Sequence, residues 1–181
     1  MESFRKAVLQ IVDFIEKNKK DRSFFCLTGD FGCGKTALGN FIEKFYQDVV
    51  FVNSDYFRVD NYNQKSKNDL EYFLSSYNFI LLKEETDHFL NGKDFGIYIK
   101  KNGKINKKVF LNSRSKILLL EFPFIFSKQD ILPADFIIEI KNIEKKRMSS
   151  NSETSILANK AMALYKDNIS DIYRSNLVVL N

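Results

Sequence analysis

The feature that most limits how this chain can fold is the segment 29–36, which reads G-D-F-G-C-G-K-T. It fits the pattern G-x-x-x-x-G-K-[S/T] of a phosphate-binding loop. An apolar run, residues 24–28, precedes the segment, and residues 37–45 after it carry apolar side chains at helical spacing. A strand, a glycine-rich loop and a helix in this order are the context that the motif requires. The sequence therefore predicts a nucleotide-binding loop.

Each residue type in this loop has a physical role in binding phosphate. The glycines let the backbone turn, so that its N–H groups converge on a phosphate at the positive end of the following helix. Lys35 is expected to reach the β- and γ-phosphates, and Thr36 to place its hydroxyl on Mg²⁺. We therefore predict ATP and Mg²⁺ as cofactors, bound by Gly29, Asp30, Phe31, Gly32, Cys33, Gly34, Lys35, Thr36 and Ala37.

Composition narrows the class of protein further. The chain has 181 residues, of which 44% are hydrophobic, so it can form a folded domain with a core. No apolar run approaches the length of a membrane span, and residues 1–6 lack the apolar region of a signal peptide. The two cysteines, Cys26 and Cys33, do not make a disulfide framework. These features predict a cytoplasmic protein that does not bind a membrane.

The formal net charge of +5 has two explanations. A basic chain can bind nucleic acid or a polyphosphate ligand. The chain is also rich in Lys, Asn, Ile and Phe, which is the composition that an AT-rich coding bias produces. We favour the second explanation, so a nucleic-acid partner is not expected. The oligomeric state stays open, with a homo-oligomer among the options.

A second candidate site residue follows the next predicted strand, residues 48–53, which is rich in β-branched and aromatic side chains. Ligands of open parallel sheets bind beyond the carboxyl ends of the strands. Asp55 is therefore expected to face the crevice beside the phosphate loop. A carboxylate there can accept the proton of a substrate hydroxyl. The alternative is that Asp55 only caps a turn or a helix.

The strongest buried-strand pattern, residues 115–121, ends in an acid, Glu121. An acidic residue at the end of an apolar strand, downstream of a phosphate loop, is the usual partner of the Mg²⁺ ion. We expect Glu121 to bind the metal together with Thr36 and to assist catalysis together with Lys35 and Asp55. The alternative is a structural hydrogen bond from the loop to Glu121.

Strands alternate with helices along the chain, which predicts an α/β fold of the P-loop NTPase type. We expect a parallel five-stranded sheet with helices on both faces and a small β-hairpin insertion. Residues 1–181 are expected to form a single domain. Within it, residues 1–20 are predicted as an N-terminal helix and 93–112 as the hairpin, with residues 100–104 as its long loop. The basic segment 141–155 is predicted to close over the phosphates as a lid, or else to form a solvated helix face.

The whole chain resembles the uridine kinase-like group of P-loop nucleoside kinases, which includes phosphoribulokinase-type relatives. The resemblance rests on residues 25–29, 50–57, 90–98, 117–121, 143–147 and 173–179. It implies that Asp55 is the catalytic base, that Tyr98 contacts the acceptor and that Arg147 belongs to the lid over the nucleotide. It also implies the activity of a kinase, which moves the γ-phosphate of ATP to a hydroxyl of a small nucleoside- or sugar-like molecule.

The sequence departs from that group at several positions. Ile99 stands where the group has an aspartate, and Phe122 follows Glu121 where the group has a glycine. The lid segment carries one arginine, Arg147, beside two lysines. The identity of the acceptor and the preference for ATP over GTP therefore stay open.

A second resemblance implies a different class of function. Residues 29–36, 120–123 and 132–135 are similar to segments of the bacterial ATPase that assists synthesis of threonylcarbamoyladenosine in tRNA. This resemblance implies a nucleotide-dependent switch that acts through a partner protein. The long spacing from the loop to Glu121, the hairpin and the final helix and strand favour the kinase. A third alternative is a chain that binds nucleotide without turnover.

Overall fold

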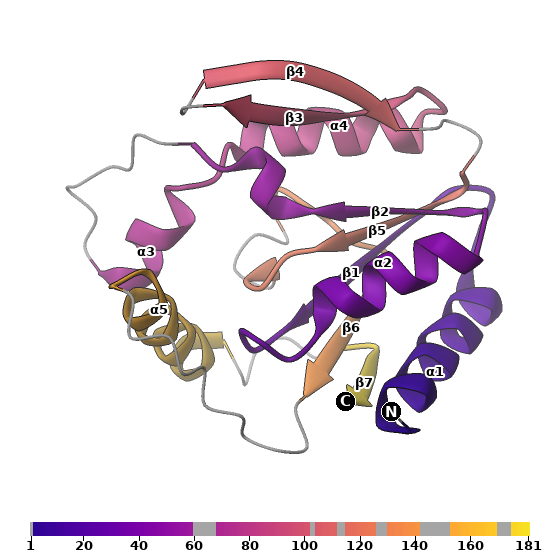
Figure 1. The fold of residues 1–181 in the computed structure, drawn as a ribbon, viewed down its shortest axis with the longest axis horizontal. Helices are drawn as coiled ribbons and strands as arrows, with labels where there is room; N and C mark the ends of the chain where they lie inside the picture. Colours follow the sequence, from indigo (N-terminus) through magenta and orange to yellow (C-terminus); the bar gives the residue numbers. More distant parts are fainter. Residues whose placement is uncertain are drawn as a thin grey trace.

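The computed structural model describes residues 2–59, 68–101, 104–111, 115–125, 130–141, 153–169 and 175–181. Its central sheet has the order β2-β5-β1-β6-β7, and each neighbouring pair of strands is parallel (Figure 1). The strands are β1 (Ser23–Gly29), β2 (Val49–Asn53), β5 (Ile117–Glu121), β6 (Phe136–Lys141) and β7 (Leu177–Leu180). The predicted α/β fold with a parallel five-stranded sheet is confirmed.

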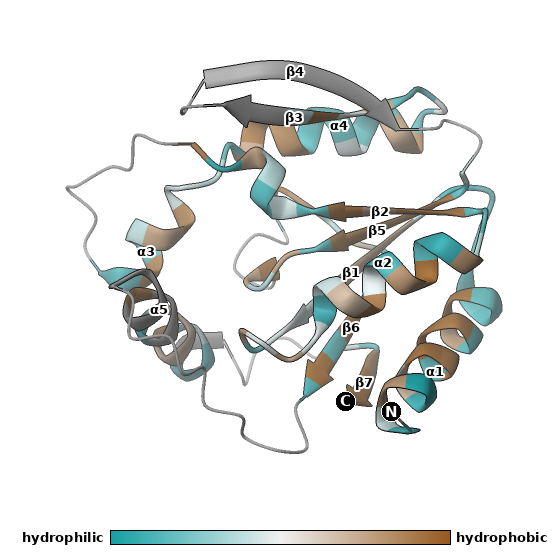
Figure 2. Cartoon of the chain, viewed as in Figure 1, coloured by the Kyte–Doolittle hydropathy of each residue, from teal (hydrophilic) through white to brown (hydrophobic). Residues whose placement is uncertain are grey.

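The two faces of the sheet are covered by different helices. α1 (Glu2–Asn18) and α2 (Lys35–Phe45) pack on one face, over side chains such as Phe25 and Leu119. α3 (Asp69–Leu74), α4 (Phe79–Leu90) and α5 (Glu153–Ile169) pack on the other face, over side chains such as Phe24 and Leu118. Because both faces are covered, the inner strands β1 and β5 are buried up to their last residue, and most of their side chains are hydrophobic (Figure 2).

The predicted hairpin forms a separate two-stranded sheet of β3 (Phe95–Lys101) and β4 (Lys104–Leu111). The buried carboxylate of Glu85 on α4 holds it in place. One oxygen of Glu85 accepts the main-chain N–H of Gly96 at 2.7 Å, and the other accepts the hydroxyl of Tyr98 at 2.9 Å. The strands extend further than predicted, so the prediction of a long loop at residues 100–104 is wrong. The pairing of Lys101 with Lys104 continues the ladder into that segment.

Two short elements have no counterpart in the sequence prediction. They are a 3₁₀ turn, η1 (Ser54–Phe57), directly after β2, and helix α3. The turn begins with a cap, because the side chain of Asn53 accepts the N–H of Asp55 at 2.8 Å. Residues 142–152 of the predicted lid, which include Arg147, lie outside the described residues.

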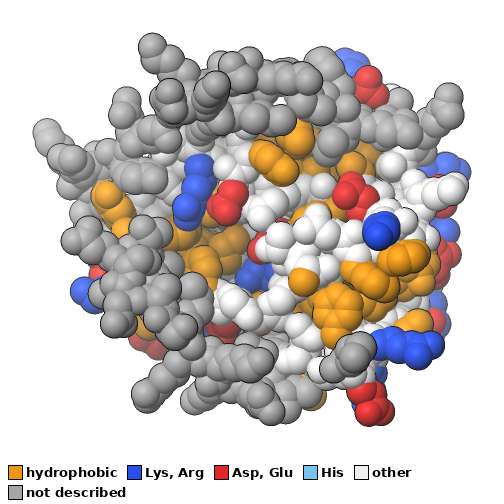
Figure 3. Space-filling view, viewed as in Figure 1, with side chains coloured by type: hydrophobic (Ala, Val, Ile, Leu, Met, Phe, Trp, Pro, Cys, Tyr) orange, Lys and Arg blue, Asp and Glu red, His pale blue; other side chains and the backbone are white. Residues whose placement is uncertain are grey.

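The outer surface over α1 and α2 carries a group of hydrophobic side chains (Figure 3). Phe41 and Phe45, both on α2, are 40% and 59% exposed, and their ring centroids lie 4.6 Å apart. In the described part of the chain, no helix combines the length and apolarity needed to cross a membrane.

Candidate functional site

The phosphate loop joins the end of β1 to the start of α2 at the middle of the sheet (Figure 1). Its first residue, Gly29, has a φ of 133° and lies against β6. A Cβ atom at this position would lie 2.2 Å from the carbonyl oxygen of Ile140. Only glycine fits both this conformation and this close approach. The first glycine of the motif is thus required by the packing of β1 against β6, apart from any role in phosphate binding.

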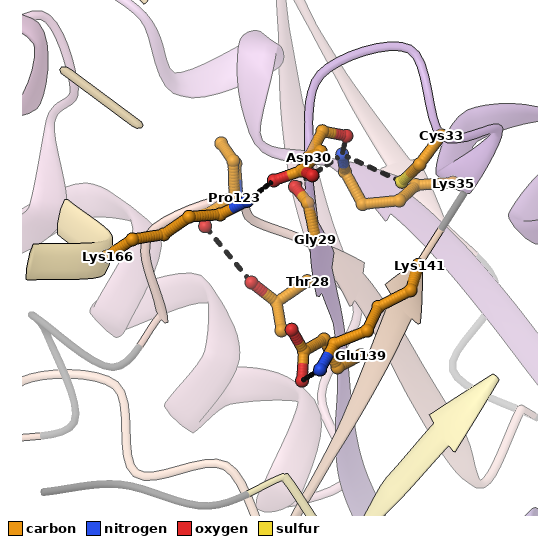
Figure 4. Close-up of polar contacts among 9 residues, drawn as sticks. All are labelled: Thr28, Gly29, Asp30, Cys33, Lys35, Pro123, Glu139, Lys141 and Lys166. Carbon is orange, nitrogen blue, oxygen red and sulfur yellow. Dashed lines mark hydrogen bonds and ion pairs between the residues drawn. The ribbon is translucent and has the colours of Figure 1, made fainter. Parts of the chain in front are cut away.

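Lys35 points back into the loop and is only 4% exposed. Its ammonium nitrogen donates to the main-chain oxygens of Gly29 at 3.0 Å and Asp30 at 2.8 Å (Figure 4). It also lies 5.9 Å from the centre of the Phe31 ring. These contacts hold the ammonium group inside the loop, and this donor fits the phosphate oxygens of a nucleotide.

Cys33, also in the loop, is buried and free. Its sulfur lies 3.7 Å from the ammonium nitrogen of Lys35. Burial raises the pKa of the thiol, and the neighbouring lysine acts in the opposite direction. The carbonyl oxygen of Cys33 accepts a hydrogen bond from the side-chain amide of Asn181 at 2.8 Å. Asn181, the residue after β7, therefore holds the main chain of the loop at Cys33.

The two predicted metal ligands lie together. The hydroxyl of Thr36 donates to a carboxylate oxygen of Glu121 at 2.8 Å. β5 lies between β1 and β2, which places Glu121 beside Leu27 on one side and Asn53 on the other. Burial raises the pKa of Glu121, while the Thr36 hydroxyl and Lys35 lower it. A hydroxyl and a carboxylate are oxygen ligands of the kind that Mg²⁺ prefers, so this pair fits the predicted ion.

A pocket of about 370 Å³ opens directly beside Thr36. Asp55 lines it, so the structure brings the predicted base to the same cavity as the predicted metal ligand. The pocket volume suits a ligand of monosaccharide or nucleoside size. Four segments contribute to it, namely α2, β2, η1 and β3, through the residues Thr36, Asn40, Glu43, Phe51, Asn53, Asp55, Tyr56 and Ile97.

The carboxylate of Asp55 is oriented by two neighbours. Oδ1 lies 3.2 Å from Nε of Arg58 and accepts a long hydrogen bond, 3.4 Å, from the hydroxyl of Tyr77. The guanidinium group of Arg58 lies over the rings of Phe73 and Tyr77, at 4.8 and 5.3 Å from their centres. Burial raises the pKa of Tyr77 to about 12, so its hydroxyl stays protonated and can donate at neutral pH.

One predicted site residue, Tyr98, takes a position other than the expected one. Tyr98 is not among the pocket-lining residues, because successive residues of a strand point to opposite sides and Ile97 faces the pocket. The hydroxyl of Tyr98 donates to Glu85 instead. Ala37 lies in the first turn of α2, and Arg147 falls outside the described residues.

The structure also adds residues that the sequence analysis did not name. Asn40 and Glu43 lie four and seven positions after Thr36, which puts all three on one side of α2. This helical spacing is a signal that could have identified them. Arg58, Asn181 and Lys166 reach the site from other segments, and no local pattern around them marks this role.

Three solved structures share this fold. A protein described as a possible uridine kinase from Bacillus stearothermophilus has a TM-score of 0.72 at 18% identity, over 99% of this chain and 100% of that one. A protein described as a fructose transport system kinase from Silicibacter sp. has a TM-score of 0.66 at 10% identity, over 97% and 98%. D-glycerate 3-kinase from Cryptococcus neoformans has a TM-score of 0.55 at 11% identity, over 99% and 96%.

All three proteins are described as kinases, but at identities of 10% to 18% these structures show the fold alone. Membership of the uridine kinase-like group, which the sequence resemblance implied, is therefore not established by them. No curated protein matches the chain. The model of one family, described as the KAP family P-loop domain, matches residues 4–176. Because that match spans nearly the whole sequence, the chain belongs to the KAP family of P-loop domains.

Proposed function

We propose that this protein is an ATP- and Mg²⁺-dependent phosphotransferase that moves the γ-phosphate of ATP to a hydroxyl of a small nucleoside- or sugar-like molecule. The observation that carries the proposal is the pocket shared by Thr36 and Asp55. A phosphate loop alone is compatible with any nucleotide-binding role. Transfer to an acceptor also requires a base close to the phosphates. Asp55 meets this requirement, because it lines a cavity that opens beside Thr36, the predicted metal ligand.

Each residue of the site has a role in this reaction. Lys35 and the loop N–H groups bind the phosphates and stabilise negative charge as it develops on the transferred group. Thr36 and Glu121 hold Mg²⁺, which neutralises charge on the phosphate oxygens when bound. Asp55 accepts the proton of the acceptor hydroxyl, and Arg58 orients its carboxylate. Most of the rate enhancement then comes from positioning and electrostatics.

The pocket lining supports a polyhydroxyl acceptor. The amides of Asn40 and Asn53 and the carboxylates of Glu43 and Asp55 are hydrogen-bonding partners for hydroxyl groups. Phe51 also lines the pocket and offers an apolar surface to a sugar or base ring. The charged side chains among these described lining residues are both acidic, which favours an uncharged acceptor over an anionic one.

The proposal is tested by ADP release in the presence of Mg²⁺ and single candidate acceptors. We expect at least one nucleoside, sugar or polyol to stimulate ADP release, with a phosphorylated product of matching mass. Glycerate and sugar phosphates serve as anionic comparison acceptors. No stimulation by any compound of a broad panel would contradict the proposal.

The same assay separates the kinase from the partner-dependent ATPase. The three structural neighbours reported above are described as kinases, and their descriptions do not favour the partner-dependent ATPase. Slow ATP hydrolysis that no acceptor stimulates, but that rises when cell extract is added, would support the ATPase instead.

A further inference from the structure

Asp30 is an acidic residue inside the phosphate loop. Its main-chain oxygen accepts a hydrogen bond from the ammonium group of Lys35 at 2.8 Å, so the residue belongs to the loop that is proposed to bind the triphosphate. A carboxylate at this position repels the phosphates of a nucleotide, since like charges at short range destabilise each other. A second positive charge besides Lys35 would offset this repulsion.

Helix α5 supplies that charge. The ammonium nitrogen of Lys166 lies 2.5 Å from a carboxylate oxygen of Asp30. Figure 4 shows the lysine reaching from α5 to the loop, on the side of Asp30 away from Lys35. The two side chains are 54% and 46% exposed, so the pair is accessible to solvent at the edge of the loop.

A second set of contacts fixes α5 relative to the loop. Tyr165, the residue before Lys166, is buried, and its ring centre lies 5.2 Å from that of Phe124. Phe124 in turn packs against Phe31 of the loop, with ring centres 5.9 Å apart. The backbone of Lys166 is thus anchored next to the loop through aromatic packing, and its position does not depend on the ion pair alone.

We propose that Lys166 is a further positioning residue of the nucleotide site: it neutralises Asp30 and so allows the loop to accept a triphosphate. This inference rests on the nucleotide site of the proposed function, but it does not require that the chain be a kinase. It predicts that the two charges act as a unit, so that loss of the lysine is harmful only while the aspartate is present.

The test compares the nucleotide affinities of single and double variants, measured by titration with fluorescent N-methylanthraniloyl-ATP in the presence of Mg²⁺. We expect Lys166→Met to weaken binding about threefold to fivefold, the size expected for a partly exposed ion pair. Asp30→Asn with Lys166→Met is expected to bind within about twofold of the wild type, and Lys166→Arg to bind as the wild type does.

The matched control is Lys160→Met, which removes an exposed lysine from the same helix. It is expected to leave affinity unchanged. The Lys166→Met effect is expected to shrink when salt is raised from about 0.05 M to about 0.5 M, because salt screens charges but does not restore a packing defect.

Three results would overturn the inference. The first is that Lys166→Met and Lys160→Met bind the nucleotide equally well. The second is that the double variant binds it as weakly as Lys166→Met alone, and the third is that the loss of affinity in Lys166→Met does not change with salt. Each of them leaves the proposed kinase standing. Failure to find an acceptor in the ADP-release assay, with nucleotide binding intact, would contradict the kinase and leave this inference standing. A wild-type protein that binds no nucleotide would overturn both.

Discussion

The phosphate loop and the acceptor pocket share Thr36, but they are built in different ways. The loop is one continuous segment, and its principal cation, Lys35, is held by main-chain oxygens of the same segment. The pocket instead draws its lining from four separate elements, α2, β2, η1 and β3. A site made from one segment depends mainly on local sequence, whereas an assembled site depends on how the elements pack.

This difference gives a general expectation for substitutions. Changes in the loop should affect nucleotide binding and every activity that needs nucleotide. Changes in the pocket should affect use of the acceptor and leave nucleotide affinity intact. Four variants test this separation, and they are ordered here from the largest expected effect to the smallest.

Lys35→Met removes the principal cation of the loop. We expect acceptor-dependent turnover to fall on the order of 10³-fold, because a preorganised charge at the transferred phosphate is lost. Steady-state ADP release measures this. Lys44→Met, which changes an exposed lysine on the same helix, should retain activity. Turnover within tenfold of the wild type would remove Lys35 from its proposed role.

Asp55→Asn tests the pocket side of the comparison. Loss of the proposed base should reduce turnover by about 10²-fold. Affinity for Mg²⁺–ATP, measured by titration calorimetry, should stay within about twofold, because Asp55 lies outside the loop segment. Asp13→Asn on α1 is an exposed control. A large loss of nucleotide affinity would instead place Asp55 in metal or nucleotide binding.

Gly39→Ala tests how far the pocket depends on packing. An added Cβ would lie 2.1 Å from the ring of Phe51, which lines the pocket from β2. We expect a loss of about 1–3 kcal/mol in the free energy of unfolding and a raised KM for the acceptor, because the ring must move.

Chemical denaturation and acceptor titration measure the two effects of Gly39→Ala. Addition of Phe51→Leu should recover part of the lost stability, since the smaller side chain makes room for the new methyl group. Equal stability of Gly39→Ala and the wild type would show that α2 and β2 can separate at little cost.

Glu121→Gln tests the residue that connects the two regions. We expect the Mg²⁺ requirement to rise about tenfold, because a charged ligand becomes neutral while the acceptor for the Thr36 hydroxyl is kept. Mg²⁺ titrations of activity measure it. An unchanged Mg²⁺ requirement would assign Glu121 to a structural hydrogen bond with the loop.

The raised pKa of Glu121 adds a pH dependence with a definite sign. Metal binding requires the ionised carboxylate, so Mg²⁺ affinity should fall as pH decreases through the raised pKa, which lies above the usual value for glutamate. For folding the sign is opposite: the folded protein binds this proton more tightly, so the contribution of Glu121 to stability declines as pH rises through that range. The Glu121→Gln variant should lack both dependences.

Much of the fold could be predicted because its signals are local. The run of hydrophobic residues in β5 indicates a strand that is buried on both faces, and the spacing of apolar residues in α1 indicates one packed side. The roles of Lys35 and Thr36 follow from the motif, and they remain predictions for experiment. Helix α3 and the turn η1 were missed because six- and four-residue elements carry too little periodicity to be recognised.

The sequence by itself determined the loop and the strands that flank it, since glycine geometry and hydrophobic periodicity act over a few residues, and the alternation of strands with helices indicated that the strands are parallel. Only the tertiary structure decided that Glu121 lies between Leu27 and Asn53, that Ile97 rather than Tyr98 faces the pocket, and that Lys166 meets Asp30. The reason is physical: these contacts join residues far apart in the chain. Strand order, strand register and helix packing determine these contacts, and the residues next to each partner in the sequence do not indicate them.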